Sequence, residues 1–242
     1  MTILWSTCAW LAFAAVALAT DVSTCYQTIA ARDVAVLQTD LDCSMVPGSG
    51  PDVVLERGAL LQLNGHRLVG GHIGVGSDPG GRRVIIEGPG EISGMTGCGI
   101  SAEGPALVRN VQVHDNGCGI TSVYTFSLKL EDVGVTNNAG DGVTYLSDVK
   151  HGKVSGERVT ISGNGGAGVR APHTLSLEEA SITGNGGGGA IAGRTIRAQD
   201  STLTGNGPSG DVATRRAILR NTTCEHSVDL DTSGPLGVCS LD

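Results

Sequence analysis

The stretch Ser162-Gly-Asn-Gly-Gly-Ala-Gly-Val169 decides the fold, because closely similar segments recur on both sides of it. Each of these segments carries an Asn at the equivalent position: Asn116, Asn138, Asn164, Asn185 and Asn206. From 116 through 138, 164 and 185 to 206, the steps are 22, 26, 21 and 21 residues. A unit of about 21 residues, with about five extra residues in one coil, indicates a solenoid.

The residues before each Asn predict a strand. Val133-Gly-Val135 and Val159-Thr-Ile161 alternate apolar and small or polar residues, which is the period of a strand with one buried face. Units this short leave no room for a helix. The sequence therefore predicts an all-β fold, a single-stranded right-handed parallel β-helix of about 21-residue coils. Leucine-rich repeats are the alternative solenoid, but they need several Leu per unit and these units hold one or none.

The composition agrees with a β-helix and excludes other classes. The 242 residues include 38 Gly but only two Trp, three Tyr and two Phe, so stacked Val, Ile and Leu must form the core. We expect Gly to supply positive φ at the corners between strands. An apolar fraction of 40% argues against disorder, and a net charge of −8 makes nucleic acid an unfavourable partner.

The recurring Asn is interpreted as an internal ladder. In a solenoid, equivalent residues stack one coil apart, and stacked side-chain amides can hydrogen-bond to the coils above and below. The Asn residues of the repeat are therefore expected to stabilise the fold rather than to act on a ligand.

The N-terminus predicts export. Residues 3–19 are almost uninterruptedly apolar and end in Ala17-Leu18-Ala19, a pattern that signal peptidase recognises. We expect residues 1–19 to be a signal peptide cleaved after Ala19, and residues 20–242 to form the β-helix domain of a secreted or periplasmic protein. An uncleaved membrane anchor is the alternative. No later apolar run approaches this length, so no membrane contact is expected after cleavage.

The cysteines predict disulfide-stapled ends. Six remain in the mature chain: Cys25, Cys43, Cys98, Cys118, Cys224 and Cys239. An even number in an exported chain indicates disulfides, and the spacings are too wide for a structural zinc site. Cys98-Gly-Ile100 and Cys118-Gly-Ile120 occupy the same position one coil apart, which predicts a Cys98–Cys118 bond. Cys25 and Cys43 bracket the first strands. Cys224 takes a core position of the repeat, where it would meet Cys239 in the tail.

The start of the mature chain resembles a known family. The segments Cys25-Tyr-Gln-Thr-Ile29 and 36–43, followed by 53–66 with its Leu63-Asn-Gly-His66 element, are similar to the start of secreted bacterial right-handed parallel β-helix proteins of the pectin-lyase-like group. The resemblance covers essentially the whole mature chain. It implies the fold, whereas relatives include polysaccharide lyases, glycoside hydrolases, uronate epimerases and a maturation protein for a copper enzyme.

Catalytic motifs known from that group are absent. The Asn-Thr-Asp, Asp-Asp, Gly-His-Gly and Arg-Ile-Lys elements of polygalacturonase-like hydrolases do not occur, nor does the Trp-Ile-Asp-His element of pectate lyases. Alginate epimerases carry Asp-Pro-His-Asp, for which this chain offers only Ala171-Pro-His173. Each absence weighs against the corresponding enzyme.

The remaining candidate is a surface on one strand face. Thr121, Thr144 and Arg170 each follow an inward residue and should stack facing outward, where pectin-lyase-like enzymes hold their sugar. The five-residue insertion lies within 145–155, and long loops on solenoids often line a binding groove. The acids, bases and cations expected near it are Asp141, Tyr145, Asp148, Lys150, His151, Arg170 and His173.

These residues suggest roles for an enzyme of acidic polysaccharides. A uronate lyase or epimerase must neutralise the sugar carboxylate, by Ca²⁺ or by Arg170 and Lys150, and then remove the C5 proton with His151, His173 or Tyr145. Thr121, Thr144 and Tyr145 would contact substrate. A hydrolase would instead use the carboxylates of Asp141 and Asp148. The alternative is that all are ordinary solvated loop residues.

Three functions stay open at this point. The leading hypothesis is a secreted β-helix protein that contacts carbohydrate, as a binding surface or as a lyase, epimerase or hydrolase of an acidic polysaccharide. The main alternative is a non-catalytic structural or surface-interaction solenoid, which the absence of Trp from the mature chain favours. A weaker alternative is a periplasmic accessory protein for a metal enzyme, with His66 and His72 as ligands. The sequence specifies no oligomeric state.

Overall fold

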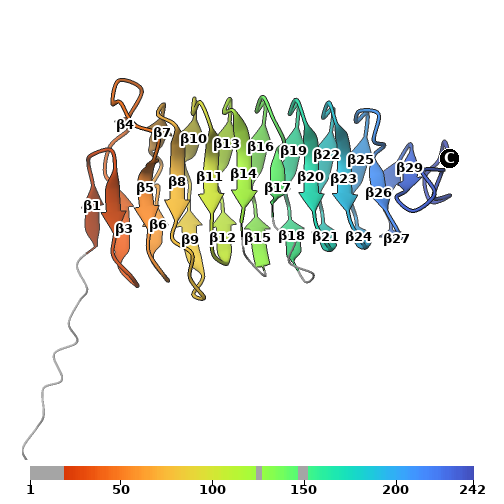
Figure 1. Ribbon diagram of the computed structural model, residues 1–242, viewed down its shortest axis with the longest axis horizontal. Coiled ribbons are helices and arrows are strands. Elements are labelled where there is room, and N and C mark those ends of the chain that lie inside the picture. Colours follow the sequence, from red (N-terminus) through yellow and green to blue (C-terminus); the bar gives the residue numbers. More distant parts are fainter. Residues whose placement is uncertain (1–18, 124–126, 147–151) are drawn as a thin grey trace, which may run out of the picture.

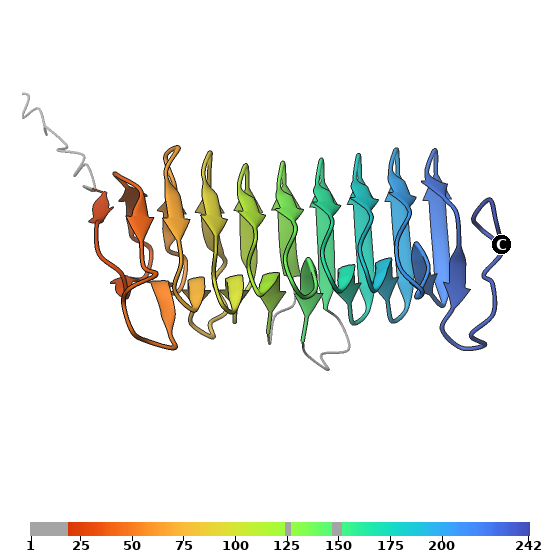
Figure 2. The ribbon, with the colours of Figure 1, turned by 90° about the horizontal axis from the view of Figure 1, so that it is seen from above.

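The protein folds as a parallel β-solenoid. The computed structural model describes residues 19–123, 127–146 and 152–242. These residues form about nine turns of about 22 residues each, and no helix occurs among them. Successive turns stack along one axis from the N-terminal strand to the C-terminus (Figures 1 and 2). The predicted all-β parallel solenoid is confirmed. The predicted signal peptide lies, except for Ala19, outside the described residues.

Each turn contributes one short strand to each of three parallel sheets, which we call sheets A, B and C. The chain runs from sheet B to sheet A, then to sheet C, and back to sheet B of the next turn. Sheet A contains β1 (Thr20–Val22), β3 (Val34–Leu37), β6 (Leu60–Gln62), β9 (Val84–Glu87), β12 (Ala106–Arg109), β15 (Ser127–Glu131), β18 (Lys153–Glu157), β21 (Thr174–Glu178), β24 (Thr195–Gln199) and β27 (Arg216–Arg220).

The other two sheets supply the remaining strands of each coil. Sheet B contains β2 (Gln27–Ile29), β5 (Pro51–Leu55), β8 (Ile73–Ser77), β11 (Cys98–Ala102), β14 (Cys118–Ser122), β17 (Val143–Tyr145), β20 (Ala167–Ala171), β23 (Gly188–Ala192), β26 (Val212–Thr214) and β29 (Ser227–Asp229). Sheet C contains β4 (Leu41–Asp42), β7 (Arg67–Val69), β10 (Glu91–Ser93), β13 (Gln112–His114), β16 (Gly134–Thr136), β19 (Thr160–Ser162), β22 (Ser181–Thr183), β25 (Thr202–Thr204) and β28 (Thr223–Cys224).

The core is a set of apolar columns that run along the solenoid axis. Because strands pair in register, equivalent inward residues of neighbouring turns lie on top of one another. The sheet C column illustrates this, and every member is at most 4% exposed: Leu68, Ile92, Val113, Val135, Ile161, Ile182, Leu203 and Cys224. Continuous aliphatic columns explain how a chain with so few aromatic residues can fold.

The predicted Asn ladder forms the corner between sheets C and B. Nδ2 of Asn138 donates to Oδ1 of Asn164 at 2.9 Å, and Nδ2 of Asn164 donates to Oδ1 of Asn185 at 2.9 Å. The same oxygens also accept the backbone N–H of the preceding Asn. These three Asn residues are 1% exposed. The ladder therefore satisfies side-chain and backbone groups that would otherwise be buried without partners.

The repeated Gly residues mainly make room for this ladder. A Cβ added at Gly142 would lie 2.8 Å from Nδ2 of Asn164, and one at Gly168 would lie 2.9 Å from Nδ2 of Asn185. We expected Gly to supply the positive φ angles at the corners, but Gly supplies only some of them. Gly163 has φ of 66°, but the corner between sheets A and C uses non-Gly residues such as Arg158, with φ of 50°, and Glu179, with φ of 51°.

Three disulfides join the predicted pairs: Cys25–Cys43, Cys98–Cys118 and Cys224–Cys239. Cys98 and Cys118 are register partners on adjacent strands with Cα atoms 4.3 Å apart, which confirms the proposed link between neighbouring coils. The other two bonds lie near the ends of the solenoid. Disulfides indicate an oxidising extracellular or periplasmic environment. No apolar helix of membrane-spanning length occurs in the described part of the chain.

Candidate functional site

A groove on the outer face of sheet A is the candidate functional site. Two hollows form it, of about 240 and 300 Å³, and both are lined by Ser176, Leu177 and Glu178 of β21. They therefore adjoin and extend from β15 to β27 along the solenoid axis. We call this surface the sheet A groove. Its charged lining consists of Lys129, Lys153, Glu157, Glu178, Arg197 and Arg220.

Strand register arranges these side chains in rows. Outward residues of sheet A stack on their equivalents in the next turn, just as the core residues do. One row consists of Glu131, Glu157, Glu178, Gln199 and Arg220. The row beside it consists of Lys129, Ser155, Ser176 and Arg197. The groove therefore presents polar groups at each step of about 4.8 Å along the axis.

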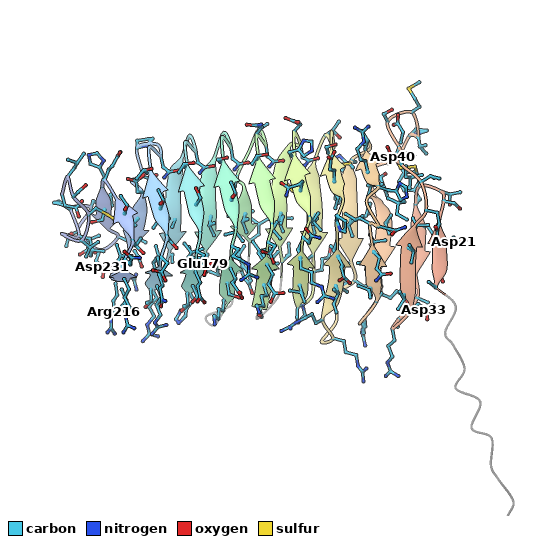
Figure 3. All side chains as sticks on the ribbon, turned by 180° about the vertical axis from the view of Figure 1, so that it is seen from behind. Asp21, Asp33, Asp40, Glu179, Arg216 and Asp231 are labelled. Carbon is cyan, nitrogen blue, oxygen red and sulfur yellow. A yellow bond between two sulfur atoms is a disulfide. The ribbon has the colours of Figure 1, made fainter. Side chains whose placement is uncertain are left out.

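Among the described residues of the groove, cations that form no ion pair outnumber anions that form none. Lys129 forms an ion pair with Glu131, and Glu157 forms one with Arg158 beyond the strand end. Three cations lining the groove form no ion pair with any described residue: Lys153, Arg197 and Arg220. Arg216 lies on the same strand as Arg220, near the C-terminal end of the solenoid (Figure 3). In a protein with net charge −8, this local excess favours an anionic ligand.

Two of the sequence-predicted catalytic residues meet in a structural contact. Asp141 Oδ2 accepts a hydrogen bond from Nε of Arg170 at 3.3 Å, while Oδ1 accepts the backbone N–H of Ala167 at 2.7 Å. The carboxylate thus links its coil to the next. Nε2 of His173 lies 3.4 Å from Nη1 of Arg194. Asp148, Lys150 and His151 lie outside the described residues, so their predicted roles stay predictions.

The predicted substrate-binding residues stack as expected but are buried. Thr121, Thr144 and Arg170 are successive register partners in sheet B. Thr121 is 4% exposed, Thr144 is 6% exposed, and Tyr145 is 4% exposed within the apolar core. Their hydroxyls have no hydrogen-bond partner among the residues that the structure describes. Contact with substrate stays a prediction for these residues, and it would require that their hydroxyls become accessible.

The His66 and His72 pair makes separate local contacts. Nδ1 of His66 lies 3.4 Å from Oδ1 of Asp40, and Nδ1 of His72 lies 3.1 Å from Oγ1 of Thr96. Within the described ranges, the group of three metal-ligating side chains whose ligand atoms converge is a different one, Asp211, Glu225 and His226. The carboxylate of Asp211 is already engaged by backbone and side-chain N–H donors. We assign no metal to this group.

One buried carboxyl has an unusual environment. Asp52 of β5 is fully buried, and neither of its oxygens has a hydrogen-bond partner in the described part of the chain. Burial raises the pKa of this carboxyl to about 7. Its carboxyl fills the space beside Gly71, where any added Cβ would lie 2.2 Å from Oδ2. The group lies on the inner side of the first turns, away from the sheet A groove. Its consequence is for stability rather than ligand contact.

The residues of the sheet A groove are not among the site residues predicted from the sequence. Their signal was present as a second repeat, since the five strands begin at Ser127, Lys153, Thr174, Thr195 and Arg216, in steps of 26, 21, 21 and 21 residues. Within each strand, apolar inward residues alternate with outward residues that are mostly polar. The Asn and Gly segments are more uniform from turn to turn, so they form the stronger repeat signal, and that signal points to the corner and to sheet B.

Comparison of the chain with protein-family models, with curated proteins and with solved structures gives no significant match. The resemblance to pectin-lyase-like proteins therefore rests on the residues of the N-terminal segments and on the β-solenoid itself. The fold class and the disulfides are established for this chain.

Proposed function

We propose that this protein is a secreted or periplasmic β-helix protein that binds an acidic polysaccharide along the sheet A groove. The observation that supports this proposal is the pair of adjoining hollows that reach from β15 to β27, with rows of polar side chains parallel to the axis. An extended polymer could follow the groove and contact each strand in turn. A compact ligand would use only a small part of the surface.

The charge of the groove supports an acidic polymer. Arg197 and Arg220 lie on adjacent strands and have no carboxylate partner among the described residues. A guanidinium group can donate two parallel hydrogen bonds to a sugar carboxylate. Hydroxyls of Ser155 and Ser176, on the preceding strands β18 and β21, can bond neutral sugar hydroxyls. Uronic acid polymers combine both kinds of group.

A hydrolase is a second candidate, because Glu157 and Glu178 are register partners on adjacent strands in the groove. Paired strands lie about 4.8 Å apart, and retaining glycoside hydrolases use two carboxyl groups about 5 to 5.5 Å apart. Glu157 forms an ion pair with Arg158, so in a hydrolase it would be assigned as the nucleophile. Glu178 forms no ion pair with a described residue, so it is available as the acid.

The test is affinity electrophoresis of the mature protein in gels that contain an acidic or a neutral polysaccharide. Retardation by polygalacturonate or alginate, but not by a neutral glucan, is the expected result. Arg197→Gln and Arg220→Gln should each weaken binding about tenfold through loss of a charge-assisted bond. Arg215→Gln is the matched control, since Arg215 pairs with Asp231 and does not line the groove. Retardation that is equal for all three variants would refute the assignment of the site.

Activity is measured on the same substrates. New reducing ends that disappear in Glu178→Gln would identify a hydrolase. Ultraviolet absorbance of unsaturated uronates, with and without Ca²⁺, would identify a lyase instead and would direct mutagenesis to Arg170 and to the residues of 145–155.

A further inference from the structure

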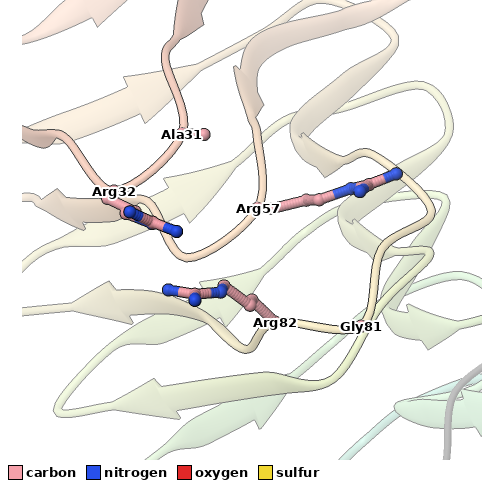
Figure 4. Close-up of a pocket in the computed structure, with 5 residues that line it drawn as sticks. All are labelled: Ala31, Arg32, Arg57, Gly81 and Arg82. Carbon is pink, nitrogen blue, oxygen red and sulfur yellow. The ribbon is translucent and has the colours of Figure 1, made fainter.

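Three arginines of successive turns gather at the corner between sheets B and A. Arg32 follows β2, Arg57 follows β5, and Arg82 precedes β9. Together with Ala31 and Gly81 they line a hollow of about 490 Å³ (Figure 4). The hollow lies on the first turns of the solenoid, whereas the sheet A groove lies between β15 and β27.

Two glycines lie beside these side chains. A Cβ added at Gly58 would lie 3.7 Å from Cγ of Arg32 and 3.8 Å from Cβ and Cδ of Arg82, which is ordinary van der Waals distance, so the stems of both arginines pass close to this glycine. Figure 4 shows the Arg32 and Arg82 side chains extending toward the same region, while Arg57 extends the other way. Arg57 lies across Gly80, where an added Cβ would be 2.7 Å from Nε.

The three guanidinium groups have no acidic partner. None of them forms an ion pair with a residue of the described ranges. The neighbouring Glu56 uses its Oε2 atom to accept the backbone N–H of Ala31 at 3.1 Å. Arg32 and Arg82 extend toward the same region, and like charges that approach without a counter-ion repel each other. An external anion would relieve this repulsion.

We propose that this arginine pocket binds a phosphate or sulfate group, either as a free ion or as an ester. A tetrahedral oxyanion presents several oxygens to guanidinium groups, and it can accept hydrogen bonds from Arg32 and Arg82 together over the gap at Gly58. Arg57 adds a third positive charge at the rim. The hollow is larger than the anion alone requires, so it has room for part of an esterified sugar. The site is independent of the sheet A groove and of its proposed ligand.

Isothermal titration calorimetry with inorganic phosphate, inorganic sulfate, a sugar phosphate and a sulfated disaccharide tests the proposal. Saturable binding at one site is expected for at least one of these anions. Arg32→Gln and Arg82→Gln should each weaken it at least about tenfold, and Arg82→Lys should weaken it less, because Lys keeps the charge but loses the planar fork. Tighter binding of an ester than of the free ion identifies the ester as the source, and equal binding identifies the ion alone.

The matched control is Arg83→Gln, which removes the same charge from the adjacent exposed residue that does not line the hollow. Its affinity should stay within about twofold of the wild type. Absence of saturable binding by any of the four anions would overturn the proposal, as would equal weakening by Arg83→Gln and Arg82→Gln. Thermal unfolding of each variant confirms that it is folded. Retardation by polygalacturonate should be unchanged in Arg82→Gln, which separates this site from the groove.

Discussion

Asn206 donates its side-chain amide to Oδ1 of Asp211 at 2.8 Å, so a carboxylate ends the amide ladder. The same Oδ1 accepts the backbone N–H of Asn206, while Oδ2 accepts the backbone N–H groups of Glu225 and His226. All four bonds require an acceptor, and an ionised carboxylate offers acceptors only. Asp211 thus connects the ladder to the chain segment that closes the C-terminal end.

Asp211→Asn should destabilise the protein by about 2 kcal/mol. The new amide would place NH₂ donors where Oδ1 or Oδ2 now accepts two N–H groups, which leaves buried donors without acceptors. The measurement is urea unfolding followed by circular dichroism. Asp231→Asn, at an exposed position, is the control and should change the free energy of unfolding by less than about 1 kcal/mol. Equal stability of Asp211→Asn and the wild type would disprove this role.

Asn164→Ala should be more damaging, at about 3 kcal/mol or more. Asn164 donates to the carbonyl of Val135 and to Asn185, and it accepts from the backbone and side chain of Asn138. Removal leaves several buried groups unsatisfied in the middle of the ladder. Ser162→Ala, on the outer face of sheet C, is the control in the same unfolding experiment. If Asn164→Ala lowered the free energy of unfolding no more than Ser162→Ala does, packing alone would stabilise the corner.

Removal of the Cys98–Cys118 bond should lower stability by about 3 kcal/mol, because the bond closes a loop with a sequence separation of 20 in the unfolded chain. The variant is Cys98→Ala with Cys118→Ala, compared by thermal unfolding with the wild type. The strands remain paired through β11 and β14, so a folded solenoid is expected. An unchanged midpoint of thermal unfolding would mean that this disulfide does little to restrict the unfolded chain.

Asp52 predicts a fall in stability with rising pH. Its folded pKa of about 7 lies above the ordinary value of 3.8, so the folded state binds more protons between roughly pH 4 and pH 7. The contribution to the free energy of unfolding is therefore most favourable below this range and declines by about 1 kcal/mol per pH unit as pH rises through it. Above about pH 7 the decline from this group ends.

Asp52→Asn should remove this part of the pH dependence. Its stability relative to the wild type should grow from pH 4 to pH 7, as measured by urea unfolding at a series of pH values. Asp33→Asn, at an exposed position of the first turn, controls for the change in net charge. Parallel pH profiles of Asp52→Asn and the wild type would rule out a raised pKa for this carboxyl.

Much of the fold could be predicted from the sequence because stacking makes equivalent residues visible as a repeat. The Asn positions gave the length of the coil, and the matched Cys98 and Cys118 segments gave the disulfide and the register. The end of the ladder was not predictable in this way. Asp211 follows Asn206 by only five residues, outside the repeat, and its role depends on a chain reversal that the period does not reveal.

The candidate site was harder to predict because ligand-facing residues of a solenoid vary from turn to turn. Arg197 replaces Ser176 at the same position of the next coil, and only the fold brings both onto one groove. Thr144 illustrates a different limit of the sequence, and its contact with substrate stays a prediction. The alternation of residues in its strand predicts that Thr144 lies on the outer face of sheet B, yet its hydroxyl is buried. Sequence alternation indicates which side of the strand a residue lies on, but not whether other residues cover that side.

The most direct test of the account is the affinity of the mature protein for oligogalacturonates of increasing length, measured by titration calorimetry. If the chain lies along the sheet A groove, affinity should rise with each added sugar until the oligomer spans the strands from β15 to β27, and then level off. Arg197→Gln should lower the plateau about tenfold, and added salt should weaken binding. Affinity that is independent of length, or equal in the wild type and Arg197→Gln, would contradict the account.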